Sequence, residues 1–195
     1  MSTLKVNTIV PESGDTVNIN DVTVNTKLDL TDAEVVGLDR PGKVLQVKSF
    51  TLTDPESVVA MPVKTFFDTG LTLSITPSSV NSKIMVFIDM SMTGSDTLCS
   101  ATIKRNGTPI LLGSTPGIGY ASGKHVSGTA QPENVSMSVL DNPGTVSAVT
   151  YTAGVASGQA GGSGSPFWIN QPKSGVTAEY MNQQTSTITL MEIAE

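Results

Sequence analysis

The stretch from Ser82 to Gly94, SKIMVFIDMSMTG, constrains the fold more than any other part of this chain. Successive side chains of a β-strand point to opposite faces, so one face of this strand is aliphatic throughout (Ile84, Val86, Ile88, Met90 and Met92). The other face carries Met85 and Phe87 beside Asp89 and Ser91. Such a strand lines a core with its first face and needs a separate cover for its second. The cover is either another part of the same chain or another copy of it.

From residue 43 onward the sequence predicts a succession of strands without a convincing helix. The Asn106-Gly107 pair between two of them is a strong signal for a type I′ hairpin turn. Turn residues recur every 8–12 positions, the spacing of an antiparallel β-sandwich or jelly roll. We therefore predict an all-β, jelly-roll-like sandwich over residues 41–195. Its strands are expected at 43–53, 63–70, 71–76, 83–93, 98–106, 108–113, 135–142, 146–155, 167–170 and 187–194.

The composition supports this class and excludes others. Charged residues make up only 14% of the chain, and Ser, Thr, Gly and Asn fill the difference. Little charge with abundant Thr, Val and Ser is typical of β-rich surface proteins. The net charge of −6 argues against nucleic-acid binding, which needs a basic footprint. No apolar run is long enough for a membrane-spanning helix, so no membrane insertion is expected. The N-terminus lacks the pattern of a signal peptide, which predicts synthesis in the cytoplasm.

Residues 1–40 differ from the remainder because they contain no aromatic residue. Two short alternating segments, LKVNTIV and DTVNINDVTVN, flank a polar turn. Strands with so few large side chains cannot form an independent core, so this segment has to pair with something else. We predict an anchor that docks to a larger particle, with a pair of strands packed on its own sandwich as the alternative. The expected anchor residues are Leu4, Val6, Ile9, Val17, Ile19, Val22 and Val24.

The residues that most enzymes and metal sites require are scarce. The chain has one histidine, His125, and one cysteine, Cys99, which leaves no His/Cys metal cluster. Cys99 lies in a strand pattern typical of a buried thiol. The glycine-rich stretches lack the helix and the lysine of phosphate-binding loops. We therefore expect a protein without cofactor, metal or catalytic residues.

Two long connections, 113–134 and 154–166, are the best candidates for outward-facing surface, because loops of this length are usually functional or disordered. Aromatic residues in such loops are the usual platform for sugars. If these loops bind a ligand, the expected ligand-binding residues are Tyr120, His125, Phe167, Trp168 and Tyr180. The alternative for Trp168 is a position in the core or at an interface.

The last strand repeats the two-faced pattern. Ile188 and Leu190 share one face, while Met191 and Ile193 share the other. If this strand lies beside the 83–93 strand, their second faces form an apolar patch, and monomers rarely leave such a patch open to water. We predict that self-association about a symmetry axis, as a trimer, covers Met85, Phe87, Met191 and Ile193. Cover by a loop or by the N-terminal segment is the alternative.

Several segments carry a resemblance to one family. The opening MSTLKVNTIVPESGDTVNIN is similar to the start of structural proteins of tailed marine and cyanobacterial phages. Five further segments resemble a module at the ends of phage tail-fibre-like proteins. They are GKVLQV, SITPSSVNSKIMV, IKRNGTPI, MSVLDNPGTVSAVTYT and STITLMEIA. This resemblance implies a trimeric β-rich virion surface protein, made in the host cytoplasm and similar in outline to tumour-necrosis-factor-like jelly rolls.

With about 40 residues before the sandwich, the chain favours a compact appendage, either a short tail fibre or a head fibre or capsid decoration protein. The expected partners are two further copies, other virion proteins of the capsid or tail, and, through the loops, host surface polysaccharide. The alternative from a different class is a secreted lectin-like carbohydrate-binding module.

Overall fold

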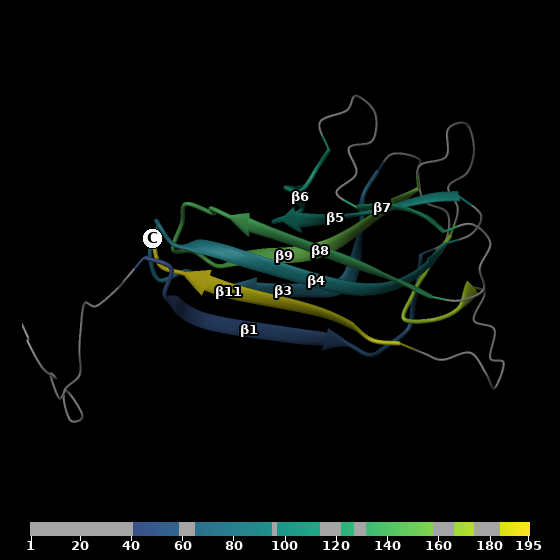
Figure 1. Ribbon diagram of the computed structural model, residues 1–195, viewed down its shortest axis with the longest axis horizontal. Helices are drawn as coiled ribbons and strands as arrows, with labels where there is room; N and C mark the ends of the chain where they lie inside the picture. The colour runs from purple at the N-terminus through teal and green to yellow at the C-terminus, as the bar shows by residue number, and fades with distance from the viewer. Residues whose placement is uncertain are drawn as a thin grey trace, which may run out of the picture. The chain divides into compact units, whose positions relative to one another are not determined.

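The structure, a computed structural model, describes residues 41–58, 65–94, 97–113, 122–126, 132–157, 166–173 and 184–195. The predicted anchor segment and its seven residues lie outside this part of the chain. Eleven strands make up the regular structure of the described residues (Figure 1). They are β1 (Val44–Leu52), β2 (Glu56–Val58), β3 (Phe67–Ile75), β4 (Lys83–Gly94), β5 (Thr97–Arg105), β6 (Thr108–Pro109), β7 (Ser122–Val126), β8 (Glu133–Asp141), β9 (Val149–Ser157), β10 (Phe167–Ile169) and β11 (Ser186–Ile193).

Two antiparallel sheets divide these strands between them. The first has the order β1-β11-β4-β8. The long strand β4 pairs with β11 along its first part and with β10 at its end, and β10 in turn pairs with β2. The second has the order β3-β9-β5, with β6 and β7 both pairing with β5. The first sheet combines strands from the beginning, middle and end of the described chain, whereas the second is built from strands between residues 67 and 157. The predicted all-β antiparallel sandwich is confirmed.

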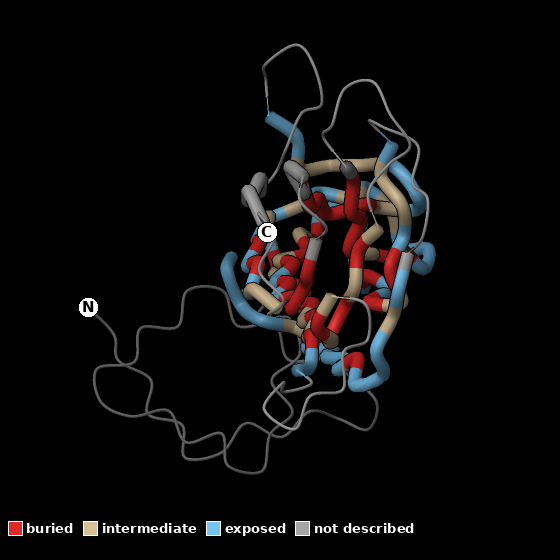
Figure 2. The backbone as a smooth tube through the Cα atoms, turned by 90° about the vertical axis from the view of Figure 1, so that its right-hand side faces the viewer, coloured by how far each residue is buried: buried red, intermediate tan, exposed pale blue. Residues whose placement is uncertain are grey.

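The core lies between the sheets and follows from the alternation of the strands. The first face of β4 is buried as predicted, and Ile188 and Leu190 of β11 are also fully buried beside it. From the second sheet, Tyr151 and Val155 of β9 and Ile103 of β5 face them. Figure 2 shows the buried residues gathered in the middle of the sandwich, with the exposed ones around its rim. The last strand, β11, lies between β1 and β4.

Two predicted strands, 63–70 and 71–76, form the single strand β3. A bulge between Asp68 and Thr72 interrupts its register with β9 and explains the break in the sequence pattern. At the bulge, the backbone N–H of Gly70 donates to Glu56 Oε2 at 2.9 Å. A side chain at Gly70 would overlap this carboxylate and displace it from its hydrogen bond with the Gly70 N–H.

Strands β2 and β7 were not predicted from the sequence. Strand β7 falls inside the expected loop 113–134 and pairs with β5, where His125 lies opposite Leu98. His125 is therefore a strand residue, and the prediction of a loop position for it is wrong. The alternation that marks a strand is too weak in SGKHV, because glycine and serine occupy two of its positions.

The two ends of the sandwich differ. The chain enters at Gly42, whose N–H donates to the carbonyl of Ala194, and this entry end carries the tight turns at 76–82, 106–107 and 142–148. Asn106 and Gly107 have φ values of 47° and 82°, which confirms the predicted hairpin turn. At the far end lie the starts of β3, β8 and β11 and the end of β9, where longer stretches of sequence join the strands.

Candidate functional site

The outer face of the first sheet carries an apolar row that runs across four strands. Directly paired residues of antiparallel strands share a face, and the register pairs Val47 with Met191, Met191 with Met85, and Met85 with Leu140. These four residues, here called the outer apolar row, come from β1, β11, β4 and β8 in turn. The row therefore reaches from one edge of the sheet to the other.

The row and its neighbour Phe87 are open to solvent. Val47 is 56% exposed, Leu140 51% and Phe87 42%, whereas Met85, Met191 and Ile193 are half-buried by the side chains around them. Towards the far end the same face is closed. There Ser91 Oγ donates to Gln184 Oε1 at 2.7 Å, and both Ser91 and Thr93 are buried. The open part of the face is thus limited to the half of the sheet next to the entry end.

Charge is nearly absent from this open area. Below the row, Lys83 pairs with Glu195 at 3.0 Å. Above it, Asp89 Oδ1 accepts hydrogen bonds from Asn134 Nδ2 at 2.6 Å and Ser136 Oγ at 2.7 Å. Because its own chain supplies these donors, the Asp89 carboxylate already has partners that water would otherwise provide. Burial of the face by another surface would leave no unpaired cation and only a hydrogen-bonded anion.

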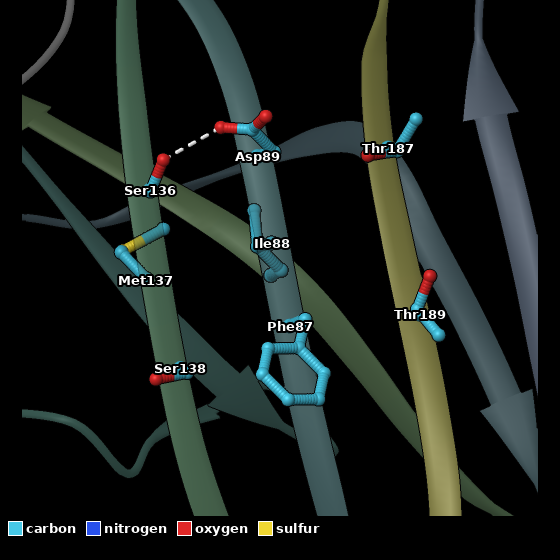
Figure 3. Close-up of a pocket in the computed structure, with 8 residues that line it drawn as sticks. All are labelled: Phe87, Ile88, Asp89, Ser136, Met137, Ser138, Thr187 and Thr189. Carbon is cyan, nitrogen blue, oxygen red and sulfur yellow. Dashed lines mark hydrogen bonds between the residues drawn. The ribbon is translucent and has the colours of Figure 1, made fainter.

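A shallow depression of about 330 Å³ lies beside Phe87 in this face. Figure 3 shows the Phe87 ring over β4, with Ser136 and Ser138 on one neighbouring strand and Thr187 and Thr189 on the other. Asp89 closes the depression on the side towards the far end. The walls are therefore one aromatic ring, the small side chains of serine and threonine, and a single carboxylate.

The outer face of the second sheet is different in character. Thr72 bonds to Thr152 at 2.9 Å and Ser74 to Thr150 at 2.7 Å across β3 and β9, which makes a ladder of hydroxyl groups. Hydroxyl pairs of this kind are well solvated and need no further cover. The two outer faces of one sandwich thus differ, and the apolar one is specific to the first sheet.

The structure brings the four residues of the predicted trimer contact onto one face. Met85 and Met191 are directly paired, Phe87 lies opposite Thr189, and Ile193 lies opposite Lys83. Val47 and Leu140, the two ends of the row, were not predicted from the sequence. Each is an apolar residue on the outward positions of its strand, but only the register across four strands shows that they continue the row.

The structure separates the residues proposed for ligand binding. Phe167 is fully buried in β10 as part of the core, so its assignment to a ligand-binding loop is corrected. Trp168 points to the opposite face, half-buried, and is paired with Thr93 and Ser57. Tyr120 and Tyr180 lie outside the described residues, and the His125 backbone belongs to β7.

Buried polar groups elsewhere fasten the sandwich together. Glu192, on the inner face of β11, accepts from Ser78 N–H and Ser78 Oγ, each at 2.6 Å, and from Gln46 Nε2 at 2.6 Å. Burial alone would raise the pKa of Glu192, but the hydrogen bonds from Ser78 and Gln46 outweigh it and lower the pKa to about 2. Glu192 is therefore ionised in the folded protein and ties β11 to the 76–82 turn.

A second buried group joins the two sheets near the same end. Tyr151 Oη donates to Asp141 Oδ2 at 2.7 Å, and Arg105 Nη1 lies 3.0 Å from Asp141 Oδ1. Burial, together with the hydrogen bond to Asp141 and its negative charge, raises the pKa of Tyr151 well above its ordinary value. A phenol held so firmly in its neutral form is a structural donor and a poor acid or base.

Within the described residues, no three His, Cys, Asp or Glu side chains come together as a metal site. No helix in that part of the chain is long and apolar enough to cross a bilayer. The candidate functional site is therefore the outer apolar row with the depression beside it, a surface suited to contact with protein.

Comparison with known proteins gives little beyond this. No protein-family model matches the sequence, and no curated protein matches it. Solved structures that resemble it include the T=1 particles derived from infectious bursal virus (13% identity, TM-score 0.40) and the VP2 subviral particle of infectious bursal disease virus (12% identity, TM-score 0.37). Each match covers 87% of this chain but only 41% and 42% of the respective capsid chain. At this level of similarity, the description of the fold depends on the strand order alone, and no function follows from these structures.

Proposed function

We propose that this protein is a non-enzymatic structural component of a virus particle, a short trimeric appendage on the virion surface. The observation that carries the proposal is the open apolar face of the first sheet, which needs a cover. The chain's resemblance to phage tail-fibre-like proteins supplies the setting, with a head fibre, a capsid decoration protein or a short tail fibre as the specific forms.

Burial of the face would contribute substantially to assembly. Complete burial of a Val, Leu, Phe or Met side chain is worth about 1.5–3 kcal/mol by area transfer. Val47, Leu140 and Phe87 still have roughly half of that gain available, and the methionines a smaller part. Summed over several contacts per subunit, such burial offsets the entropy lost on association. The absence of unpaired charge in the row removes the main penalty.

The width of the sheet is sufficient for copies to meet around one axis. Four strands spaced about 4.8 Å apart give a face about 15 Å wide, and packed sheets lie about 10 Å apart. In the proposed trimer each copy turns this face towards the axis, and the side chains of its row pack against those of the next copy. Contacts on this face are Met85, Phe87, Met191 and Ile193, extended by Val47 and Leu140.

The difference between the ends of the sandwich suits an appendage. The preceding residues 1–40 join at the entry end, where the turns are short, and the longer connections belong to the far end. In the proposed arrangement, residues 1–40 dock to a capsid or tail protein and the far end faces outward. Three docking segments on one trimer bind with avidity, so each contact can be weak. Host surface polysaccharide is the proposed ligand of the outward end, and half-buried Trp168 is an aromatic residue that could contribute to it.

Two substitutions test the self-association. Met85→Asp places a charge in the centre of the row and is expected to convert the trimer into a folded monomer, as measured by light scattering on a sizing column and by circular dichroism. Thr152→Asp, on the hydroxyl ladder of the second sheet, is the matched control and should remain trimeric. A trimer that survives Met85→Asp would show that the contact lies elsewhere.

The docking role is tested on particles. The full chain and a chain lacking residues 1–40 are incubated with purified virions that have been stripped of the protein, and the bound fraction is measured by sedimentation. The full chain should bind and the shortened chain should not. Equal binding by both would refute the anchor. A glycan array probed with the intact trimer tests the outward end, and an absence of hits would leave a purely structural role.

A further inference from the structure

We propose that the trimer contact joins two different patches, with Leu140 on the β8 edge of one copy seated in the depression beside Phe87 of the next. The inference rests on the proposed trimer and specifies how its copies meet. In this arrangement a second copy of this chain occupies the depression. In the symmetric alternative, two identical faces would pack against each other.

Leu140 has the position and exposure of a projecting group. It is the end member of the outer apolar row, 51% exposed, on a strand that pairs with β4 on one side. Among the described strands, none pairs with the other side of β8. The side chain is therefore free to contact a neighbouring molecule that approaches the β8 edge. An exposed edge of this kind is one that natural proteins usually cover.

The depression has the matching properties. Its aromatic wall, Phe87, and the methyl groups of Thr187 and Thr189 offer apolar surface, and a volume of about 330 Å³ has room for a leucine side chain. Leu140 of the same chain is paired with Met85 in the neighbouring row, so it does not fill this space itself. The projecting group and the depression thus occupy different places on the same face.

The low charge around the depression permits contact with a second copy. The chain carries a net charge of −6, so two copies repel each other unless they meet where charge is low. Asp89 is the only charged side chain in the three described rows that contain Met85, Phe87 and Asp89 itself, and its own chain supplies it with two hydrogen bonds. The depression therefore carries a single, hydrogen-bonded carboxylate, so another copy that inserts an apolar side chain beside it meets little repulsion.

Two complementary patches on one chain define a heterologous contact, which closes into a ring when the rotation between copies suits it. In a ring of three, every Leu140 is buried and every depression is filled. A symmetric pair formed face to face would instead bring the centres of two rows together and leave Val47 and Leu140 at its margins. The edge-to-edge course of the row is better covered by the ring.

The test uses two variants of the full chain that each remove one half of the contact. Leu140→Asp removes the projecting group and keeps the depression. Thr189→Trp fills the depression and keeps Leu140. Each variant alone is expected to be monomeric, a threefold loss of mass on light scattering, with unchanged circular dichroism. Leu112→Asp is the matched control, because Leu112 is also 51% exposed but belongs to the segment after β6, and it should remain trimeric.

Mixing decides the nature of the contact. Leu140→Asp and Thr189→Trp together retain one complete contact, so an equimolar mixture is expected to form a complex of one copy of each and nothing larger. Absence of this complex would overturn the heterologous contact. If the Leu140→Asp variant is still trimeric, the heterologous contact is overturned too, although the proposed trimer stands. A monomeric wild type would overturn both. Binding of a soluble sugar can be followed by nuclear magnetic resonance through the signals of Phe87. If the sugar displaces Leu140, the depression is a glycan site and the inference is overturned.

Discussion

Glu192 is the residue whose replacement gives the most quantitative test of how this sandwich is held together. Its buried carboxylate accepts three hydrogen bonds from Ser78 and Gln46, and they lower its pKa from 4.5 to about 2. Since one pKa unit corresponds to about 1.4 kcal/mol, ionised Glu192 stabilises the folded protein by roughly 3 kcal/mol at neutral pH. Glu192→Gln keeps the shape, removes the charge, and places an amide group against the Gln46 donor.

The sign of the pH dependence follows from the lowered pKa. As the pH falls, the unfolded chain binds the proton at about pH 4.5, whereas the folded chain resists it down to about pH 2. The stabilisation is therefore complete above about pH 5.5 and is lost progressively between about pH 5 and pH 2. Glu192→Gln should unfold with about 2–3 kcal/mol less free energy than the wild type at pH 7 and show little difference near pH 2.

Urea unfolding at a fixed protein concentration, measured at pH 7, 5, 3.5 and 2.5, provides the comparison. Glu195→Gln is the control, because Glu195 forms a surface pair with Lys83 and its side chain is 51% exposed, so its loss should cost less than about 1 kcal/mol. A Glu192→Gln variant that loses the same free energy at pH 7 and at pH 2.5 would refute the charge-based account and leave only a packing role.

Three further substitutions test the fold by the same urea titration. Asn170→Ala should cost about 2–4 kcal/mol, because buried Asn170 donates to the carbonyl of Leu52 and accepts from Ser186 Oγ; a loss below about 1 kcal/mol would show that water replaces the side chain. Phe167→Ala should lower the free energy of unfolding by about 3–5 kcal/mol, because it opens a core cavity. An unchanged free energy of unfolding would show that Phe167 is not a core residue. Gly107→Ala should cost about 1 kcal/mol from its positive φ of 82° alone, since nothing lies within 4 Å of the added methyl group; unchanged stability would mean that the turn relaxes.

The fold class was predictable because the strands of this chain follow the two-residue period closely. In β4 the aliphatic positions repeat without a break, and in β11 they lead almost to the last residue. The hairpin at Asn106-Gly107 was predictable because few sequences satisfy two positive φ values. These are local signals, readable without knowing which strands pair.

The parts that the sequence did not indicate depend on pairing over long distances. Glu56 bonds to Gly70 at a bulge, and Asn170 bridges β1 and β11, so neither role shows until the strands are assembled. The outer apolar row is similar. Met85 and Met191 stand out in two-faced strands, whereas Val47 and Leu140 look like ordinary strand residues until the register aligns them. The strand at Phe167 was predicted, but Phe167 was given a ligand-binding role because it follows a glycine-rich stretch, and its burial became clear only from the structure.

The central claim, that copies of this chain cover the open face of the first sheet, is tested most directly by the mass of the full-length protein in solution. Light scattering on a sizing column should give about 61 kDa, three times the 20.3 kDa of one chain, over a wide range of protein concentrations. A mass of 20.3 kDa at micromolar concentration would contradict the account, because the outer apolar row would then remain open to water without another copy to bury it.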